Sequence, residues 1–328
     1  MEKIRLYFVL IGIAFCVTPK VIFSQDPQFS QFYANRLYFN PSLAGISDYA
    51  RISVNYRNLW PLAGLPFHTY SVSYDQNLPK INSGMGLRIM NDQAGGGAIT
   101  TTTVDGIYSY HFNLTKKLSL SAGLELSYIR RSINLSNLIF QDMLNESGVV
   151  VRASAEGVPS FSPSVIDVSS GTVLYSDNYY IGFAAHHINQ SGGTIQRTDT
   201  EFPPRKFTIH AGGTIPIGAR TVDDSRIYLQ PSVIYQQQGK IKQAFFGTFA
   251  NRKYLTFGIW GRYNVGANFD AIIILGGINM KDYQLAYSFD YTLSSLFLRS
   301  LGAHEISFSY RIKTKGKDKK RMISCPRF

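Results

Sequence analysis

LSLSAGLELSYI, residues 118–129, is the stretch that decides the fold class. Its odd positions from Ser119 to Ser127 are small or polar, and its even positions carry the larger apolar side chains Leu118, Leu120, Ala122, Leu124, Leu126 and Tyr128. Successive side chains of an extended strand point to opposite faces, so the stretch predicts a sheet with one apolar face and one polar face. This stretch alone does not decide whether the apolar face meets a soluble core or a lipid bilayer.

The same alternation recurs along the chain and predicts an all-β protein of about fourteen strands. The other segments lie near residues 51–57, 69–75, 85–89, 103–112, 164–174, 179–188, 206–217, 226–237, 242–251, 254–263, 269–279, 283–293 and 304–312. An even number of strands places both ends of a closed barrel on the same side.

The lengths of the connections favour a transmembrane antiparallel β-barrel of the outer-membrane type. Long connections (59–66, 92–99, 132–160, 189–204, 294–303) alternate with mostly tight ones (79–83, 113–117, 176–178, 252–253, 281–282). Outer-membrane barrels have short turns on the periplasmic rim and long loops on the other, whereas a soluble sandwich has no reason to sort its loops. Two connections, 218–225 and 238–240, break the rule, and Pro231 interrupts an expected strand.

The composition agrees with a barrel. Only 16% of residues are charged and 14% are aromatic, with 21 Tyr and 22 Phe. Beyond the first residues, no apolar run reaches the roughly 18 residues that a membrane-spanning helix needs. Aromatic girdles at the two lipid interfaces explain the Tyr excess, with Tyr56, Tyr110, Tyr128, Tyr263, Tyr291 and Tyr310 near expected strand ends.

Four regions are expected along the chain. Residues 1–24 carry Lys3 and Arg5, an apolar run too short for a membrane anchor, and Ser24, which is typical of a signal peptide. Residues 25–50 form an aromatic lead-in without strand periodicity, expected to pack at the periplasmic mouth of the barrel or as a plug. Residues 51–312 form the barrel, and residues 313–328 form a basic periplasmic tail.

Cysteine usage leaves no internal disulfide in the exported chain. Cys16 is expected to leave with the signal peptide, and the bulky Phe15 before it does not fit a lipoprotein signal. Cys325 then remains as a single thiol, either free or paired with another chain. The formal charge of +12 is concentrated in the tail, and export makes nucleic acid an unsuitable partner.

No catalytic, cofactor-binding or metal-binding residue is predicted. The usual hydrolase, metalloprotease, nucleotide-binding and redox motifs are missing from the sequence. A hydrolase at the barrel rim is an alternative, but His186 and His187 are adjacent in an expected strand and should point to opposite faces.

Eight charged residues are in phase with the small polar residues and are predicted to face the lumen. They are Arg57, Arg88, Asp105, Glu125, Arg262, Asp290, Glu305 and Arg311. Because both signs occur, internal ion pairs are the first interpretation, and lining a conduit or gripping a plug is the second.

Three motifs resemble the PorP/SprF family of the type IX secretion system in Bacteroidetes. They are QDPQFSQFYANRLYFNPSLAG at residues 25–45, Arg-Asn-x-Trp at residues 57–60, and the ending Cys-Pro-Arg-Phe at residues 325–328. The resemblance extends over the whole exported chain, including the order of signal peptide, barrel and basic tail.

The resemblance implies an outer-membrane protein of a Gram-negative cell that is not an enzyme. It implies partners among the machinery subunits and among secreted cargo with a type B C-terminal domain, including gliding adhesins held at the cell surface. The candidate contact residues are Phe29, Phe32, Tyr33, Asn40, Pro41, Cys325, Pro326, Arg327 and Phe328. The alternatives are a lead-in that only seals the barrel and a protein that is a general porin.

Overall fold

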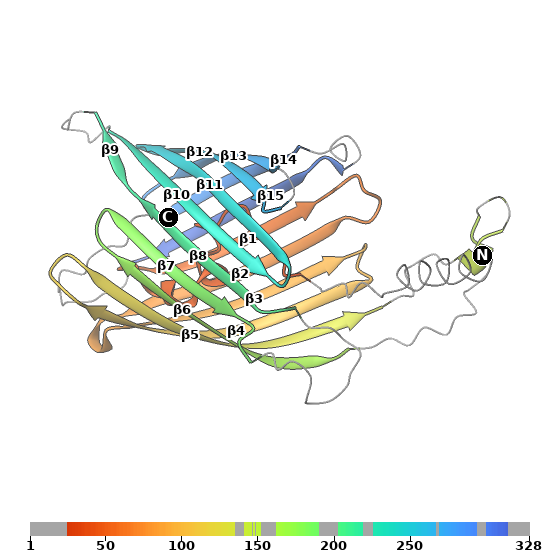
Figure 1. The fold of residues 1–328 in the computed structure, drawn as a ribbon, viewed down its shortest axis with the longest axis horizontal. Helices are drawn as coiled ribbons and strands as arrows, with labels where there is room; N and C mark the ends of the chain where they lie inside the picture. The colour runs from red at the N-terminus through yellow and green to blue at the C-terminus, as the bar shows by residue number, and fades with distance from the viewer. Residues whose placement is uncertain are drawn as a thin grey trace, which may run out of the picture.

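The computed structural model describes residues 25–134, 141–145, 147, 149–151, 162–189, 203–218, 226–266, 269–293 and 300–313. These residues form one antiparallel sheet of 15 strands, in which each strand pairs with its neighbour along the chain except that β8 pairs with β10 instead of β9. The sheet closes on itself because β1 pairs with β15 and β10 pairs with β11 (Figure 1). Strands β8 and β9 both pair with β10 and are two parts of one barrel strand, so the predicted all-β barrel of 14 strands is confirmed.

The strand bounds agree with the segments expected from alternation. The strands are β1 (Ala50–Leu59), β2 (Phe67–Leu78), β3 (Ser83–Ala94), β4 (Ile99–Asn113), β5 (Ser119–Ile133), β6 (Ser164–Tyr175), β7 (Tyr179–His186), β8 (Lys206–Gly213), β9 (Ile215–Ile217), β10 (Ile227–Gln238), β11 (Ile241–Arg252), β12 (Leu255–Asn264), β13 (Phe269–Asn279), β14 (Tyr283–Thr292) and β15 (Ala303–Ile312). The helical pieces are α2 (Arg36–Phe39), η1 (Pro41–Leu43), η2 (Pro79–Ile81) and η4 (Gln141–Met143).

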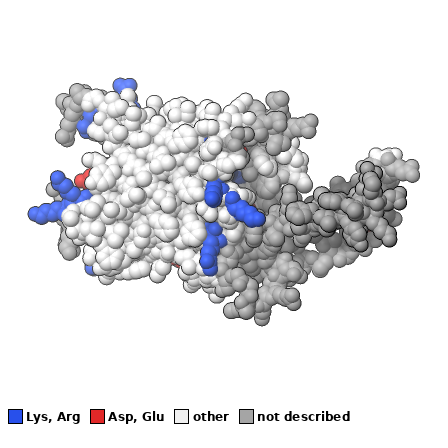
Figure 2. Space-filling view, viewed as in Figure 1, with Lys and Arg blue, Asp and Glu red and all other residues white. Residues whose placement is uncertain are grey.

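The outer wall of the barrel is apolar. In β5, Leu124 and Leu126 are 62% and 59% exposed, while Glu125 between them is only 3% exposed. Exposed Leu, Ile, Val, Phe and Tyr side chains cover the other strands in the same way, which suits hydrocarbon as the surrounding medium. Figure 2 shows an uncharged surface between charged side chains that gather at the two ends of the barrel. Within the described ranges, no helix is long and apolar enough to cross a membrane.

The two rims of the barrel differ in their connections. The tight-turn rim, as we name it, carries the connections β2–β3, β4–β5, β6–β7, β9–β10, β11–β12 and β13–β14. The long-loop rim carries β1–β2, β3–β4, β5–β6, β7–β8, β10–β11, β12–β13 and β14–β15. The longest connections in the chain, between β5 and β6 and between β7 and β8, lie on the long-loop rim.

Residues 25–49, the plug, lie inside the barrel (Figure 1). The backbone N–H of Asp26 donates to the side chain of Gln238 at the long-loop end of β10. Further along, Gly45 reaches Asp75 at the tight-turn end of β2, and the chain then enters β1. The plug therefore runs the length of the lumen, with its first residues at the long-loop end.

One side of the plug packs on an apolar inner wall. Phe32 lies 5.0 Å from the ring of Phe245 and 5.8 Å from that of Trp260, and Tyr33 lies 5.1 Å from Phe249. The complete buried cluster contains Phe32, Tyr33, Ala34, Phe39, Leu43, Ile46, Val173, Tyr175, Tyr180, Ile234, Phe245, Phe249, Trp260, Ile273, Leu275 and Ala286. The lumen of a barrel is usually lined by polar groups and water. The inward-facing aromatic residues of this wall instead pack against the apolar side chains of the plug.

The opposite side of the plug lies directly on the backbone of β3 and β5. A Cβ atom added to Gly123 would lie 2.5 Å from the carbonyl carbon of Pro41, and one added to Gly84 would lie 2.2 Å from the carbonyl oxygen of Ala44. Both distances are far inside van der Waals contact, so only glycine at these positions leaves room for η1.

Candidate functional site

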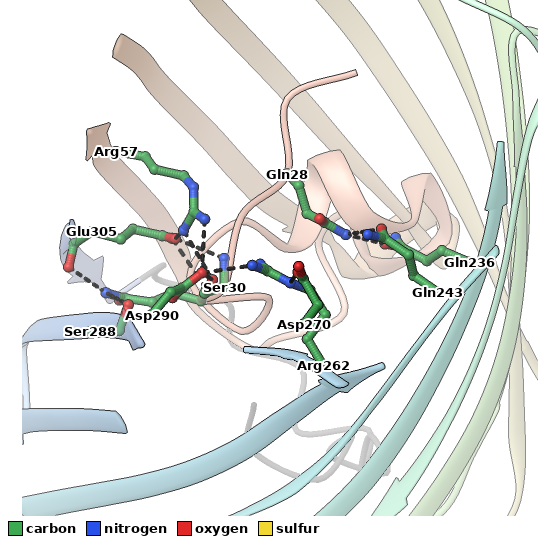
Figure 3. Close-up of polar contacts among 11 residues, drawn as sticks. Gln28, Ser30, Arg57, Gln236, Gln243, Arg262, Asp270, Ser288, Asp290 and Glu305 are labelled. Atoms are coloured by element: carbon green, nitrogen blue, oxygen red, sulfur yellow. Dashed lines mark hydrogen bonds and ion pairs between the residues drawn. The ribbon is translucent and has the colours of Figure 1, made fainter. Parts of the chain in front are cut away.

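A buried ion network joins the plug to four strands. Arg57 on β1 donates to Asp290 on β14 at 2.8 Å and to Glu305 on β15 at 3.0 Å. Arg262 on β12 reaches the same oxygen of Asp290 at 3.1 Å (Figure 3). The strands bring these side chains together through register, since Arg57 is paired with Glu305 across β1 and β15.

The plug adds further hydrogen bonds to the carboxylates of this network. Ser30 donates its hydroxyl to Asp290 at 2.7 Å and its backbone N–H to Glu305 at 2.7 Å. The side-chain amide of Gln31 donates to Ser288 at 3.1 Å and to the backbone carbonyl of Glu305 at 2.9 Å. Polar plug residues thus donate to these buried carboxylates some of the hydrogen bonds that water would donate in an open lumen.

The first residues of the plug are held by a second charged cluster near the long-loop rim. Asp26 accepts from Nε2 of His187 at 3.1 Å, and Nδ1 of the same ring lies 3.0 Å from Asp167. Lys206 lies 3.7 Å from Asp26. One imidazole therefore bridges a plug carboxylate and a wall carboxylate.

Both members of this pair have shifted pKa values. Burial alone would raise the pKa of Asp26, but the charge and hydrogen bond of His187 and the charge of Lys206 outweigh it and hold that pKa well below 3.8. Burial alone would lower the pKa of His187, but Asp26 and the hydrogen bond to Asp167 raise it to about 10. The His187 ring is a cation at neutral pH.

The expectation that His186 and His187 point to opposite faces was wrong. His187 follows the last residue of β7 and has φ of 57°, so strand alternation ends before it and both rings lie inside the barrel. His186 lies 4.0 Å from Glu125, next to a third charged group. In that group Arg88 contacts Asp105 at 2.7 Å and Glu125 at 3.5 Å.

Asn40 fixes the middle of the plug to the backbone of the wall. Its amide nitrogen donates to the carbonyl oxygens of Thr172 on β6 and Phe183 on β7, each at 3.2 Å. Its side-chain oxygen accepts from the backbone N–H of Ser42 at 3.0 Å and caps η1. Asn40 is 0% exposed, so in this structure it is a contact between the plug and the wall.

The structure brings together most of the predicted lumen-facing charges. Seven of the eight are buried inside the barrel, and Arg311 is half-buried at the tight-turn end of β15, where it donates to Asn279 at 2.7 Å. The candidate contact residues Phe29, Phe32, Tyr33, Asn40 and Pro41 are all buried in the lumen. Cys325, Pro326, Arg327 and Phe328 lie outside the described residues.

A cavity of about 1010 Å³, which we name the vestibule, occupies the long-loop half of the lumen. Plug residues Asp26, Gln28 and Tyr38 line it from within, and wall residues such as Trp60 and Thr292 at the strand ends line it near the rim. The vestibule could not be predicted from the sequence, because its lining comes from the plug and from most of the strands. Over the described part of the chain, no group of three His, Cys, Asp or Glu could hold a metal ion.

These features define a membrane protein with an outer-membrane-type β-barrel whose lumen is occupied by the segment that precedes β1. A family model described as type IX secretion system membrane protein PorP/SprF matches residues 21–310. The chain belongs to the PorP/SprF family, a family of secretion-system barrels and not of enzymes. No curated protein is similar enough in sequence to match the chain.

Solved barrel structures are similar to the chain only at low identity. A TodX mutant, described as a monoaromatic hydrocarbon channel, has a TM-score of 0.48 and 11% identity, covering 85% of this chain and 94% of that chain. The P. putida toluene transporter TodX has a TM-score of 0.47 and 10% identity, covering 84% and 93%. A Pseudomonas aeruginosa FadL homologue has a TM-score of 0.43 and 12% identity, covering 83% and 92%. At these scores, none of the three bears on what this chain does.

Proposed function

We propose that this protein is an outer-membrane subunit of the type IX secretion system that binds secreted proteins carrying a type B C-terminal domain and contacts the secretion machinery. Membership of the PorP/SprF family gives the system. The single structural observation that carries the proposal is the plug, which fills the tight-turn half of the lumen with buried side chains.

The plug weighs against the alternative of a general porin. A porin needs a continuous polar, water-filled lumen. Here Phe32 and Phe39 are 7% and 4% exposed in the middle of the barrel, and Ser30 is bonded to the Arg57 network. A solute crossing the barrel would have to break these contacts first.

The orientation follows the rule for outer-membrane barrels. The long-loop rim faces the cell exterior, and the tight-turn rim and the tail of residues 313–328 face the periplasm. Surface cargo is then held from the long-loop side and machinery subunits from the tight-turn side. Because Phe29, Phe32, Tyr33, Asn40 and Pro41 are occupied within the lumen, the tail is the stronger of the two proposed contacts for machinery.

Affinity purification tests the proposed function directly. A tag is placed on the protein in its own cell envelope, the complex is extracted gently, and mass spectrometry identifies what co-purifies. We expect a large secreted protein with a type B C-terminal domain together with type IX components. Recovery of the barrel alone, also after crosslinking, would contradict the proposal.

Conductance in planar bilayers separates the proposed function from the porin. The purified barrel should show no large steady openings, because the plug obstructs the lumen. A lipid bilayer that receives a porin of known conductance in the same detergent serves as the control for insertion. Large, stable openings of the wild-type protein would favour the porin.

A further inference from the structure

The vestibule is a half-open chamber with a floor that belongs to the same chain. Its lining reaches the ends of β1, β2, β5 and β14 at the long-loop rim, and Asp26, Gln28 and Tyr38 of the plug close it below. At about 1010 Å³ it matches the upper end of the range, about 300–1,000 Å³, that small-ligand pockets occupy. A guest therefore has to enter from the long-loop side.

The wall of the vestibule is divided chemically. One part, from β3, β4 and β5, presents apolar side chains toward the lumen, including Met90, Ile99, Ile129 and Ile133. Inward-facing apolar residues are not needed to line water, since a water-filled lumen is normally polar. Among the described plug residues that line the vestibule, only Pro27 has an aliphatic side chain. The plug therefore offers this apolar wall few aliphatic side chains to pack against.

Next to the apolar wall, three buried charged side chains keep unused hydrogen-bonding capacity. Nη1 of Arg88, Oδ1 of Asp105 and Oε2 of Glu125 have no hydrogen-bond partner among the described residues. These residues line the vestibule and are only 4%, 0% and 3% exposed. A buried polar atom without a partner is costly, so the site favours a guest that supplies one acceptor and at least one donor.

We propose that the vestibule binds a peptide segment of a partner protein, inserted from the long-loop rim. A carbonyl oxygen of the peptide accepts from Arg88, and peptide N–H groups donate to Asp105 or Glu125. An apolar peptide side chain packs against Met90 and Ile129. The inference rests on the proposed function, because it makes the vestibule the place where that partner is held.

A peptide fits this combination better than other classes of guest. A single ion would satisfy groups of one sign, and a hydrocarbon would leave the polar atoms of Arg88 and Glu125 without partners. Each peptide unit carries one strong donor and one strong acceptor a short distance apart, with a side chain beside them. That is the set of groups that the wall lacks.

The test fills the vestibule and compares matched positions on the same strands. Thr103 and Ser127 face the vestibule and are 6% and 3% exposed, while Val104 and Leu126 face outward. We expect Thr103→Trp and Ser127→Trp to reduce the recovery of the co-purified partner at least tenfold. Val104→Trp and Leu126→Trp should leave recovery unchanged. Heat-dependent migration on a denaturing gel checks that each variant is a folded barrel.

A photo-crosslinking residue, benzoylphenylalanine, at position 103 gives a second readout that does not depend on a cavity-filling variant. We expect crosslinks from position 103 to a defined short stretch of the partner, and none from position 104. Unchanged partner recovery in folded Thr103→Trp and Ser127→Trp, with no crosslink at position 103, would overturn the inference while the proposed function stands. If the wild-type protein recovers no partner, the proposed function fails and the inference fails with it.

Discussion

Arg57 is the cation on which the buried network depends. Its guanidinium contacts Asp290 and Glu305, and its side chain is 4% exposed. Two buried carboxylates around one arginine are tolerable only because Arg262 and Ser30 add further donors to Asp290. The network thus ties strands from the two ends of the sequence to the plug.

Removing that cation should destabilise the folded barrel strongly. Arg57→Met leaves two buried carboxylates with fewer donors, and we expect a loss of about 3–5 kcal/mol in the free energy of unfolding. Denaturant unfolding in detergent, followed by tryptophan fluorescence, measures it. Arg311→Met is the matched control, because Arg311 is half-buried at the rim and should cost about 1 kcal/mol or less. Equal effects of the two variants would contradict a structural role for the network.

The contact between Asp26 and His187 should depend on pH in a defined direction. The pKa of His187 rises from 6.5 to about 10 on folding, so its contribution is complete below pH 6.5 and is lost as the pH rises toward 10. The pKa of Asp26 falls below 3.8, so its contribution is present above pH 3.8 and is lost at more acidic pH. The contact is therefore strongest between pH 3.8 and pH 6.5.

The measurement is the difference in unfolding free energy between the wild type and His187→Gln. We expect this difference to be largest near pH 6 and to shrink steadily toward pH 10, where the wild-type ring loses its proton. Asp26→Asn should show the same trend, since it removes the partner of the same cation. A difference that stays constant over this range would show that the charge of His187 does not hold the plug.

At the scale of the element, the strands could be predicted from the sequence and the path of the plug could not. Alternation is a local property of the sequence, so β5 could be predicted from the pattern that begins at Leu118. The plug is placed by contacts between distant residues, such as Pro41 on Gly123, and no local period reports them. The run of Ile272, Ile273 and Ile274 in β13 was a usable signal, because it makes both faces of the strand apolar.

The same reasoning explains which part of the candidate site was visible. Arg57, Asp105 and Glu125 are in phase with small polar residues in regular strands, and so their inward direction was predictable. The expectation that His186 and His187 point to opposite faces was wrong because the positive φ of His187 ends the alternation after His186. Asn40 was chosen as an external contact, and its bonds to two wall carbonyl oxygens depend on the folded barrel.

The contact between η1 and β5 gives a prediction at this scale. A side chain at position 123 would collide with the backbone of Pro41, so Gly123→Val should push the plug away from the wall. We expect lower stability and new conductance steps in planar bilayers. Gly106→Val is the matched control, because a Cβ there meets nothing within 4 Å. If Gly123→Val were as stable as the wild type and showed no conductance steps, the prediction would be wrong, and the plug would tolerate a side chain at position 123 without opening the lumen.

At the scale of the whole molecule, the lumen has two unlike halves. The tight-turn half is filled by the plug and its aromatic cluster, and the long-loop half contains the vestibule. The plug belongs to both halves. Its residues Asp26 and Gln28 line the vestibule, and the residues that follow them, such as Phe32, pack in the aromatic cluster of the tight-turn half.

Deletion of residues 29–44 tests whether the plug is what closes the barrel. The deletion removes the aromatic and η1 contacts but keeps the wall pairs Arg57 with Glu305 and Arg88 with Asp105, so the barrel retains its own ion pairs. We expect a less stable barrel that still shows heat-dependent migration on a denaturing gel and conducts ions in planar bilayers, where the wild type does not. Adding Arg57→Met to the deletion should abolish folding, because the carboxylates then lose both the plug and the cation. A folded deletion variant that remains non-conducting would show that the described plug is not what closes the lumen.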